Sequence, residues 1–353
     1  MDDPADKPDS AKIDRDAVAR RAGVSSATVS RVYNRPQSVS ATRRAAVMQA
    51  ADELGYRPNK AASALGRKNG NLILFVDLDH SPNYFWGSPM FYSWYFAEAL
   101  QGALEVVEDS LFSLAPVRIH DQADLPRIIK ERQPAGLIFF DAVQRPLLEK
   151  LQDLGLPVVA GHHLKPFSDL RLHRCITDNH FGGTLAGQCL RDSGHKSPAY
   201  IVSALDSSFV HQARWQGFCE GFGDAGAIRL VESQAGKEGG LTATRSLIAD
   251  IRTGAIDSIG VVNDYTAMGV ILALYRQGIL IPRDVSIVSY DNLPFSEALP
   301  FPITTVDLHM RDIYRQAVSL LIDIMQGRAG KGIFETRNIR PQLVAGGSVQ
   351  RRN

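Results

Sequence analysis

Residues 26 to 31 place small, polar and basic side chains on one side of a short amphipathic segment. With helical spacing, the side chains that face outward are those of Ser26, Ala27, Ser30 and Arg31, while Val29 and the next valine, Val32, face inward. Hydroxyl and guanidinium groups on such a helix can hydrogen-bond in the major groove of DNA. These residues therefore predict a DNA-reading helix.

The preceding residues have the layout of a helix-turn-helix, which would position that segment. Val18 and Ala22 form the inner side of a first helix, and Gly23 supplies the left-handed backbone of a tight turn. Ser25 stands at the N-cap of the second helix, where its hydroxyl can accept from a free backbone amide. The alternative is an ordinary pair of surface helices with Arg31 as a solvated charge.

The distribution of charge favours DNA binding. Residues 12–68 contain twelve Lys or Arg and four Asp or Glu, a net charge of +8, whereas residues 69–353 carry −4. The total of +1 therefore conceals a basic N-terminal module on a mildly acidic body. Phosphate neutralisation and counterion release supply most of the affinity of such modules for nucleic acid.

The rest of the composition excludes several classes of protein. No apolar run approaches the ~18 residues of a membrane span. Residues 1–12 are acidic and lack the apolar core of a signal peptide, so we expect a disordered leader. Cys175, Cys189 and Cys219 lack paired spacing, which favours free thiols in a reducing cytoplasm over a disulfide or a metal site.

Motifs for catalysis or cofactor binding are missing. The GxGxxG match at 221–226 follows a helical pattern instead of a strand, so we interpret it as a helix end and loop. His162 and His163 are adjacent and do not have the i, i+4 spacing of a metal site on a helix. We therefore expect no enzyme activity, no metal and no cofactor.

Two further helices follow in the N-terminal module. Residues 40–54 predict a helix with Ser40 at its N-cap and Gly55 at its end. Residues 59–65 have the length of about two helical turns, which are marginal in isolation. We expect this segment to become helical only against DNA or a second copy of the chain; a plain basic linker is the alternative.

From residue 71 onward, short apolar runs alternate with amphipathic helical patterns. This alternation predicts two α/β lobes with parallel, doubly wound sheets and a ligand cleft at the carboxyl ends of the strands. Predicted strands include 72–77, 112–117, 136–140, 157–160, 199–203, 228–231, 259–262 and 285–289, and predicted helices include 91–108, 125–132, 145–154, 181–192, 209–222, 241–252, 265–277 and 310–326.

Four segments together identify a family: VARRAGVSSATVSRVYN (18–34), VSATRRAAVMQAADELGYRPN (39–59), Asn263-Asp264, and SYDNLPFSEALPFPITTV (289–306). They resemble the LacI/GalR family of bacterial transcription regulators over residues 13–346. The resemblance implies an all-α helix-turn-helix head with a hinge helix, joined to a two-lobed α/β effector domain of the periplasmic-binding-protein type. It also implies a homodimer whose two heads read a pseudo-palindromic operator.

The resemblance also divides the chain. The expected parts are a leader (1–12), a helix-turn-helix domain (13–56), a hinge helix and linker (57–70), an effector-binding and dimerisation domain (71–346) and a tail (347–353). Within the effector domain, lobe 1 would comprise about 71–176 and 306–328, and lobe 2 about 177–305 and 329–346.

Carried over by position, the DNA contacts fall on the head and hinge. Base edges would meet Ser26, Ala27 and Arg31, of which Arg31 is the strongest because a guanidinium can bind guanine bidentately. Phosphates would be held by Thr28, Ser30 and Asn34, and the hinge would contribute Lys60 and a minor-groove wedge, Leu65.

The effector contacts carried over are Arg214, Asn263 and Asp291, with Asp178 as a weaker match. Arginine, aspartate and asparagine together can chelate vicinal hydroxyl groups, which favours a sugar. Asp264 beside Asn263 has an equally good alternative role as a helix cap.

The segment 79–96 departs from the family pattern because it is longer and rich in aromatic residues. Aromatic faces stack on sugars, flat bases or cations, so we expect Tyr84, Phe85 or Trp86 to reach the ligand. The alternative is that aromatic side chains of this segment pack in the core.

These features favour a cytoplasmic, sequence-specific DNA-binding repressor that acts as a homodimer and is released by a small inducer, with a sugar favoured. A purine- or nucleoside-type corepressor would instead strengthen operator binding. A solute receptor shares the two-lobed body, but it would need a secretion signal and no basic head.

Replacing Leu65 with Ala should reduce specific operator binding more than non-specific binding, because a wedge acts only where DNA is kinked. Titrations of operator and random duplexes would measure both affinities. An unchanged ratio between them would remove the wedge role from Leu65.

Overall fold

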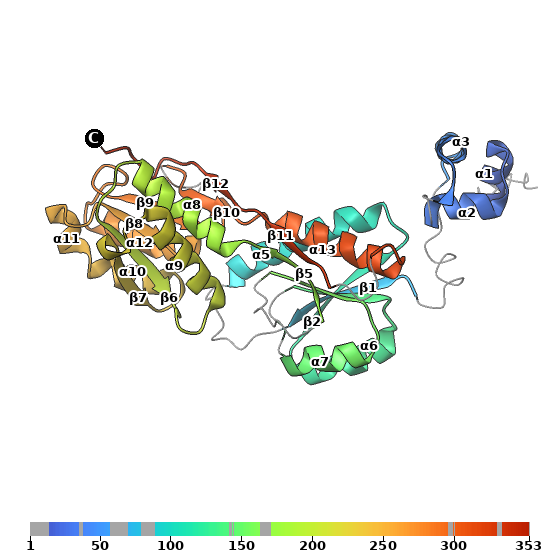
Figure 1. Ribbon diagram of the computed structural model, residues 1–353, viewed down its shortest axis with the longest axis horizontal. Helices are drawn as coiled ribbons and strands as arrows, with labels where there is room; N and C mark the ends of the chain where they lie inside the picture. The colour runs from blue at the N-terminus through green and yellow to red at the C-terminus, as the bar shows by residue number, and fades with distance from the viewer. Residues whose placement is uncertain are drawn as a thin grey trace, which may run out of the picture. The chain divides into compact units, whose positions relative to one another are not determined.

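The computed structural model describes residues 14–34, 38–56, 70–78, 89–140, 143, 145–162, 171–295, 299, 301–329 and 334–352 (Figure 1). Contacts divide the chain into one unit of residues 1–72 and 107–113 and a second unit of the remaining residues. The predicted leader (1–12) and almost all of the predicted hinge segment (57–70) lie outside the described residues. No helix in the described part has the length and apolarity to cross a bilayer.

The head consists of three helices around a small core: α1 (Arg15–Ala22), α2 (Ser26–Asn34) and α3 (Ala41–Leu54). Aliphatic side chains from all three helices are buried together, among them Val18, Val29 and Val47, each fully inaccessible to solvent. The helix-turn-helix predicted from the sequence is therefore present.

The first sheet of the body has the strand order β11-β5-β4-β3-β1-β2. Its strands are β1 (Leu72–Leu78), β2 (Ser113–Ile119), β3 (Gly136–Phe139), β4 (Val158–Gly161), β5 (His173–Thr177) and β11 (Thr336–Ile339). Its helices are α5 (Pro89–Glu108), α6 (Leu125–Arg132), α7 (Arg145–Asp153) and α13 (Met310–Met325), with a 3-10 turn η2 (Gln122–Asp124). α13 packs against β3, β4, β5 and β11.

The second sheet has the strand order β12-β10-β9-β8-β6-β7 (Figure 1). Its strands are β6 (Pro198–Ser203), β7 (Arg229–Ser233), β8 (Ser258–Val261), β9 (Ser286–Tyr290), β10 (Thr304–Asp307) and β12 (Gln342–Val344). Its helices are α8 (Asn179–Asp192), α9 (Phe209–Phe222), α10 (Gly236–Arg245), α11 (Ile248–Thr253) and α12 (Asp264–Arg276), with a 3-10 turn η3 (Ala225–Ala227). The pairings of β6, β8, β9 and β10 with one another are parallel, and β12 runs antiparallel to β10.

Both faces of the second sheet are covered, as predicted for a doubly wound sheet. In β6, Ala199 and Ile201 pack toward the helices α10, α11 and α12. Tyr200 and Val202 point to the opposite face and pack among residues of α8 and α9. The alternation follows from the two-residue period of a strand, and the uninterrupted run of hydrophobic residues over 199–202 follows from burial on both faces.

Two expectations about the body were wrong. The helix predicted over 241–252 is two helices, α10 and α11, and α10 begins earlier, at Gly236. Glycines lower helix propensity, yet Gly240 lies so close to α12 that an added Cβ would overlap the carbonyl oxygen of Thr266. Close packing therefore overrides local propensity in this segment.

The second error concerns the C-terminal crossing. Residues 329–346 were assigned to lobe 2, but β11 pairs in parallel with β5 in the first sheet, and only β12 joins the second sheet. The chain therefore passes between the sheets after β5, after β10 and after β11. The other expected boundaries stay predictions.

Helices α8 and α9 approach each other through glycines. A Cβ added at Gly183 would overlap the carbonyl oxygen of Arg214, and one added at Gly217 would overlap that of His180. The absence of side chains lets the two backbones touch, which places Asn179 of α8 beside Arg214 of α9. This close contact positions the candidate ligand site described below.

We expect Gly217→Ala to destabilise the body by about 1–3 kcal/mol, the usual cost of overpacking, because the two helices must move apart. Urea unfolding would measure the loss. Gln216→Ala, an exposed change one residue earlier on α9, is the matched control and should stay within about 0.5 kcal/mol of the parent. Equal effects of the two changes would contradict the role of this contact.

Candidate DNA-reading head and ligand cavity

The turn between α1 and α2 is built as the sequence predicts. Gly23 has φ +65° and ends α1 in the left-handed region that favours glycine. The amide of Thr28 donates to Oγ of Ser25 at 3.2 Å, and the hydroxyls of the same two residues lie 2.9 Å apart. Ser40 occupies the N-cap position of α3, but its side chain makes no capping hydrogen bond.

The outer side of α2 carries the predicted base-reading residues. Ala27 and Arg31 are exposed, and no ion pair of Arg31 is found in the described part of the chain. Ser26 is half-buried, and its hydroxyl accepts from Nε of Arg15 at 3.1 Å and donates to the Asp16 carboxylate. The side chain of Arg31 is therefore accessible to solvent, whereas the hydroxyl of Ser26 is engaged by two residues of α1.

The other predicted DNA contacts are placed less completely. Thr28 and Ser30 lie half-buried on α2. The side chain of Asn34 lies outside the described residues, as do Lys60 and Leu65. Their roles stay predictions.

In the body, Arg214 is the centre of a buried polar cluster at the carboxyl ends of the second sheet. Its side chain is 2% exposed; Nε donates to Oδ1 of Asn179 at 3.0 Å and Nη1 donates to the carbonyl of Val262 at 2.7 Å. Nη1 also lies 3.3 Å from Oδ1 of Asp291, and the guanidinium lies 4.8 Å from the ring centroid of Tyr290. A buried charge of this kind is stable only because it is paired and hydrogen-bonded.

Asp291 sits in a strained loop directly after β9. Its φ is 107° and that of Asn292 is 54°, values that non-glycine residues rarely adopt. Burial raises the pKa of the Asp291 carboxyl, and the nearby Arg214 guanidinium partly opposes that rise. Strain beside a buried charge is typical of a functional site.

Asp264 holds this loop in place. It is the first residue of α12 and is fully buried, and its carboxylate accepts from the amide of Leu293 at 2.9 Å and from the hydroxyl of Thr305 at 3.0 Å. Burial and the neighbouring charge of Asp291 raise the pKa of Asp264 to about 7. Asp264 thus fixes the backbone that presents Asp291.

Of the other predicted ligand residues, two cap helices and three lie outside the described residues. Asn263, not Asp264, is the N-cap of α12, and its Oδ1 accepts from the amide of Thr266 at 2.8 Å. Asp178 is exposed and caps α8 through the amide of Phe181 at 2.9 Å. The aromatic residues Tyr84, Phe85 and Trp86 lie outside the described residues, so their contact with a ligand stays a prediction.

Two buried side chains from the first lobe lie near Asp291, and the sequence indicated neither as a ligand residue: for Tyr95 it offered only packing in the core. Tyr95 of α5 is 2% exposed and its hydroxyl hydrogen-bonds to Asp291. His162, just after β4, stacks on Tyr95 with ring centroids 6.1 Å apart and an interplanar angle of 23°. Burial, with the charge of Arg214, lowers the pKa of His162 to about 3, so the ring is neutral at physiological pH. Residues associated with both sheets therefore meet around Asp291.

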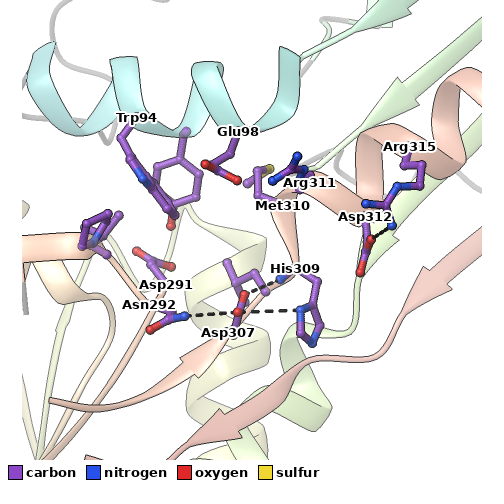
Figure 2. A pocket seen from close by; sticks show the side chains of 14 residues that line it. Trp94, Glu98, Asp291, Asn292, Asp307, His309, Met310, Arg311, Asp312 and Arg315 are labelled. Carbon is purple, nitrogen blue, oxygen red and sulfur yellow. Dashed lines mark hydrogen bonds and ion pairs between the residues drawn. The ribbon is translucent and has the colours of Figure 1, made fainter. Parts of the chain in front are cut away.

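Next to this cluster lies a cavity of about 620 Å³. Figure 2 shows Trp94 and Glu98 of α5 on one side and Asp291, Asn292 and Asp307 on the other. The remaining lining residues are Tyr95, Leu293, Pro294, Leu308, His309, Met310, Arg311, Asp312 and Arg315. This volume suits a small organic molecule. In the described part of the chain, no group of three potential metal ligands is found, and the three cysteines are free.

The comparisons with known proteins agree with this geometry. Residues 16–59 match the model of bacterial regulatory proteins of the lacI family, and residues 188–349 match a periplasmic binding protein-like domain. The transcriptional regulator GalS of Salmonella typhimurium is 30% identical over 344 residues, which cover 94% of this chain and 95% of GalS. This chain belongs to the lacI family.

Other lacI-family proteins are similar over the whole length. The transcriptional repressor PurR of Mannheimia succiniciproducens is 29% identical over 349 residues, covering 95% of this chain and 98% of PurR. The regulator CelR, solved in complex with cellobiose, shares the fold with a TM-score of 0.65 and 23% identity, over 96% of this chain and all of CelR. This lacI-family protein is accordingly a DNA-binding transcriptional regulator.

The residues missed by sequence reasoning were hidden by their surroundings. Tyr95 and Trp94 fall in an aromatic run whose periodicity is equally typical of a core helix. The spacing of His162 and His163 argues only against a metal site, although the place of His162 directly after a strand that pairs in parallel is a signal for the cleft.

The raised pKa of Asp264 predicts a pH dependence of stability. The folded state holds a proton between about pH 4 and pH 7 that the unfolded chain releases, so the free energy of unfolding should fall as the pH rises through that range. Asp264→Asn should flatten this slope, measured by urea unfolding at several pH values. The exposed Asp192→Asn is the control, and a variant slope equal to that of the parent would contradict the assignment.

Proposed function

We propose that this lacI-family regulator is a repressor that binds a pseudo-palindromic operator as a homodimer and is released by a small-molecule inducer. One observation carries the proposal: four side chains lie close together beside a cavity, those of Arg214, Asp291, Tyr95 and His162. The head of the same chain presents an exposed Arg31. The protein is a binding protein and not an enzyme, and it acts in the cytoplasm.

Coupling between the two sites follows from linkage. A ligand that contacts Tyr95 of α5 and Asp291 after β9 touches residues associated with both sheets. It therefore favours the arrangement of the two lobes in which both contacts are made. If that arrangement binds operator less well, the ligand lowers operator affinity. The size of the loss is set by the difference in ligand affinity between the two lobe arrangements.

A sugar fits the cavity by its hydrogen-bonding chemistry. Asp291 is 6% exposed, and its Oδ1, although 3.3 Å from Nη1 of Arg214, accepts no hydrogen bond of good geometry in the described part of the chain. Asn292 and Asp307 add acceptors and a donor at the same wall. Vicinal hydroxyls supply matching donors, and the cellobiose complex of the related CelR supports this class.

A purine-type corepressor is the second candidate, because Trp94 and Tyr95 line the same cavity and could stack on a base. A thermal-shift screen separates the two classes. A ligand at ~100 times its dissociation constant adds about 2.7 kcal/mol to the folded state, which raises the melting temperature. A sugar that lowers operator affinity supports induction; a purine that raises it supports corepression.

We expect Arg31→Ala to weaken operator binding by about 1–3 kcal/mol through one base position per half-site, while binding to random DNA changes less. The operator is first selected from a random duplex library, and affinities are then measured by titration. Arg31→Lys is the matched control: it keeps the charge on phosphate and loses the bidentate contact, so it should lose specificity and keep non-specific affinity. Equal losses on operator and random DNA in the alanine variant would show that Arg31 contacts only phosphate.

A further inference from the structure

The cavity beside Asp291 is lined by more acidic than basic side chains. Four carboxylates reach it, from Glu98, Asp291, Asp307 and Asp312, against the two guanidinium groups of α13. The ion pairs that these carboxylates and guanidinium groups form determine how much negative charge stays unbalanced and can attract a ligand.

Both guanidinium groups are already committed. Arg311 donates from Nε to Oε1 of Glu105 at 2.6 Å. Arg315 donates from Nη2 to the other oxygen of Glu105 at 2.8 Å and forms an ion pair with Asp312. Glu105 and Asp312 therefore balance the two arginines, and Asp291 is balanced by Arg214 at 3.3 Å.

Two carboxylates are not balanced in this way. Glu98 is half-buried and forms no ion pair with any residue that the structure describes. Asp307 accepts from the neutral amide of Asn292 at 3.2 Å and from the backbone of His309 at 2.7 Å, and Nδ1 of the His309 ring, which balances the carboxylate only when the ring is protonated, lies 3.7 Å away. No lysine or arginine pairs with Asp307 in the described part of the chain. The cavity thus retains surplus negative charge at Glu98 and Asp307.

Aromatic rings lie beside this surplus charge. Trp94 lines the cavity beside Glu98 of the same helix (Figure 2). Tyr95 also lines it, with its ring centroid 5.1 Å from that of Trp94. Aromatic faces attract cations, and the attraction grows where water is excluded. Aromatic rings together with unbalanced carboxylates are the chemistry that recognises a protonated amine.

We propose that the effector carries a protonated amine, as in an amino sugar, held by Glu98, Asp307 and the Trp94 face while its hydroxyls donate to Asp291. The inference rests on the proposed function, since it names the ligand of the same cavity. An anionic sugar phosphate would meet the same carboxylates and be repelled. A neutral sugar would leave their charge unbalanced.

Matched pairs of compounds test the charge separately from the shape. The full-length protein is screened by thermal shift with glucosamine, galactosamine and mannosamine. Each amine is compared with three partner compounds: its parent sugar, its N-acetyl derivative and the 6-phosphate of the parent sugar. We expect at least one amine to raise the melting temperature while its three partners do not. Titration calorimetry should then show at least a tenfold weaker affinity for that amine in Glu98→Gln and in Asp307→Asn.

Glu232→Gln makes the same chemical change on β7, at an exposed position outside the cavity, and should leave the affinity unchanged. Three outcomes overturn the proposal: none of the amines binds, a neutral or phosphorylated partner binds as tightly, or the bound amine is indifferent to Glu98→Gln. Operator binding is measured on the same samples. If the protein binds operator and a neutral sugar releases it, the proposed function stands and only the amine proposal fails. If the protein does not discriminate operator from random DNA, the proposed function itself fails.

Discussion

The geometry of the candidate ligand site depends on one buried positive charge. Arg214 joins α9 to α8 through Asn179, to the end of β8 through the carbonyl of Val262, and to the end of β9 through Asp291. A guanidinium has five donors in a fixed plane, so its partners must lie where the fork points. The glycine contact between α8 and α9 brings Asn179 within hydrogen-bonding distance of Arg214. The packing of these two helices therefore positions the guanidinium that pairs with Asp291 after β9.

The backbone strain that accompanies this pairing of Arg214 and Asp291 is concentrated in the loop after β9. Two consecutive non-glycine residues, Asp291 and Asn292, have positive φ values, and each such residue costs of the order of 1–3 kcal/mol. Asp264 and Thr305 offset the strain by hydrogen bonds to the loop backbone. The consequence is a carboxylate that is already oriented before a ligand arrives, which reduces the ordering that binding requires.

The sequence predicted the fold well because each element carries its own local signal. Gly23, Ser25 and the inward valines define the helix-turn-helix, and the alternating runs after residue 71 define the two parallel sheets. The family resemblance indicated Arg214 and Asp291, which the structure brings together, and their contact with a ligand stays a prediction. For the dipeptide Asn263-Asp264 the sequence left a helix cap open for Asp264, but the cap is Asn263. The place of His162 directly after a parallel strand was its one local signal. Tyr95 and Glu98 could not be found, since their position near Asp291 depends on how α5 approaches the second sheet, which no local pattern records.

The strand order has a consequence for the order of synthesis. Each sheet is completed at one edge by a strand from the last stretch of the chain: β11 flanks the first and β12 flanks the second. A ribosome that has released residues 15–54 has produced all three head helices, whereas neither sheet has its full set of strands until residues 336–344 emerge. The nascent protein therefore possesses its DNA-reading module some three hundred residues before its sensing module can close, and truncation of residues 334–353 would remove the whole of an edge strand from both sheets at once.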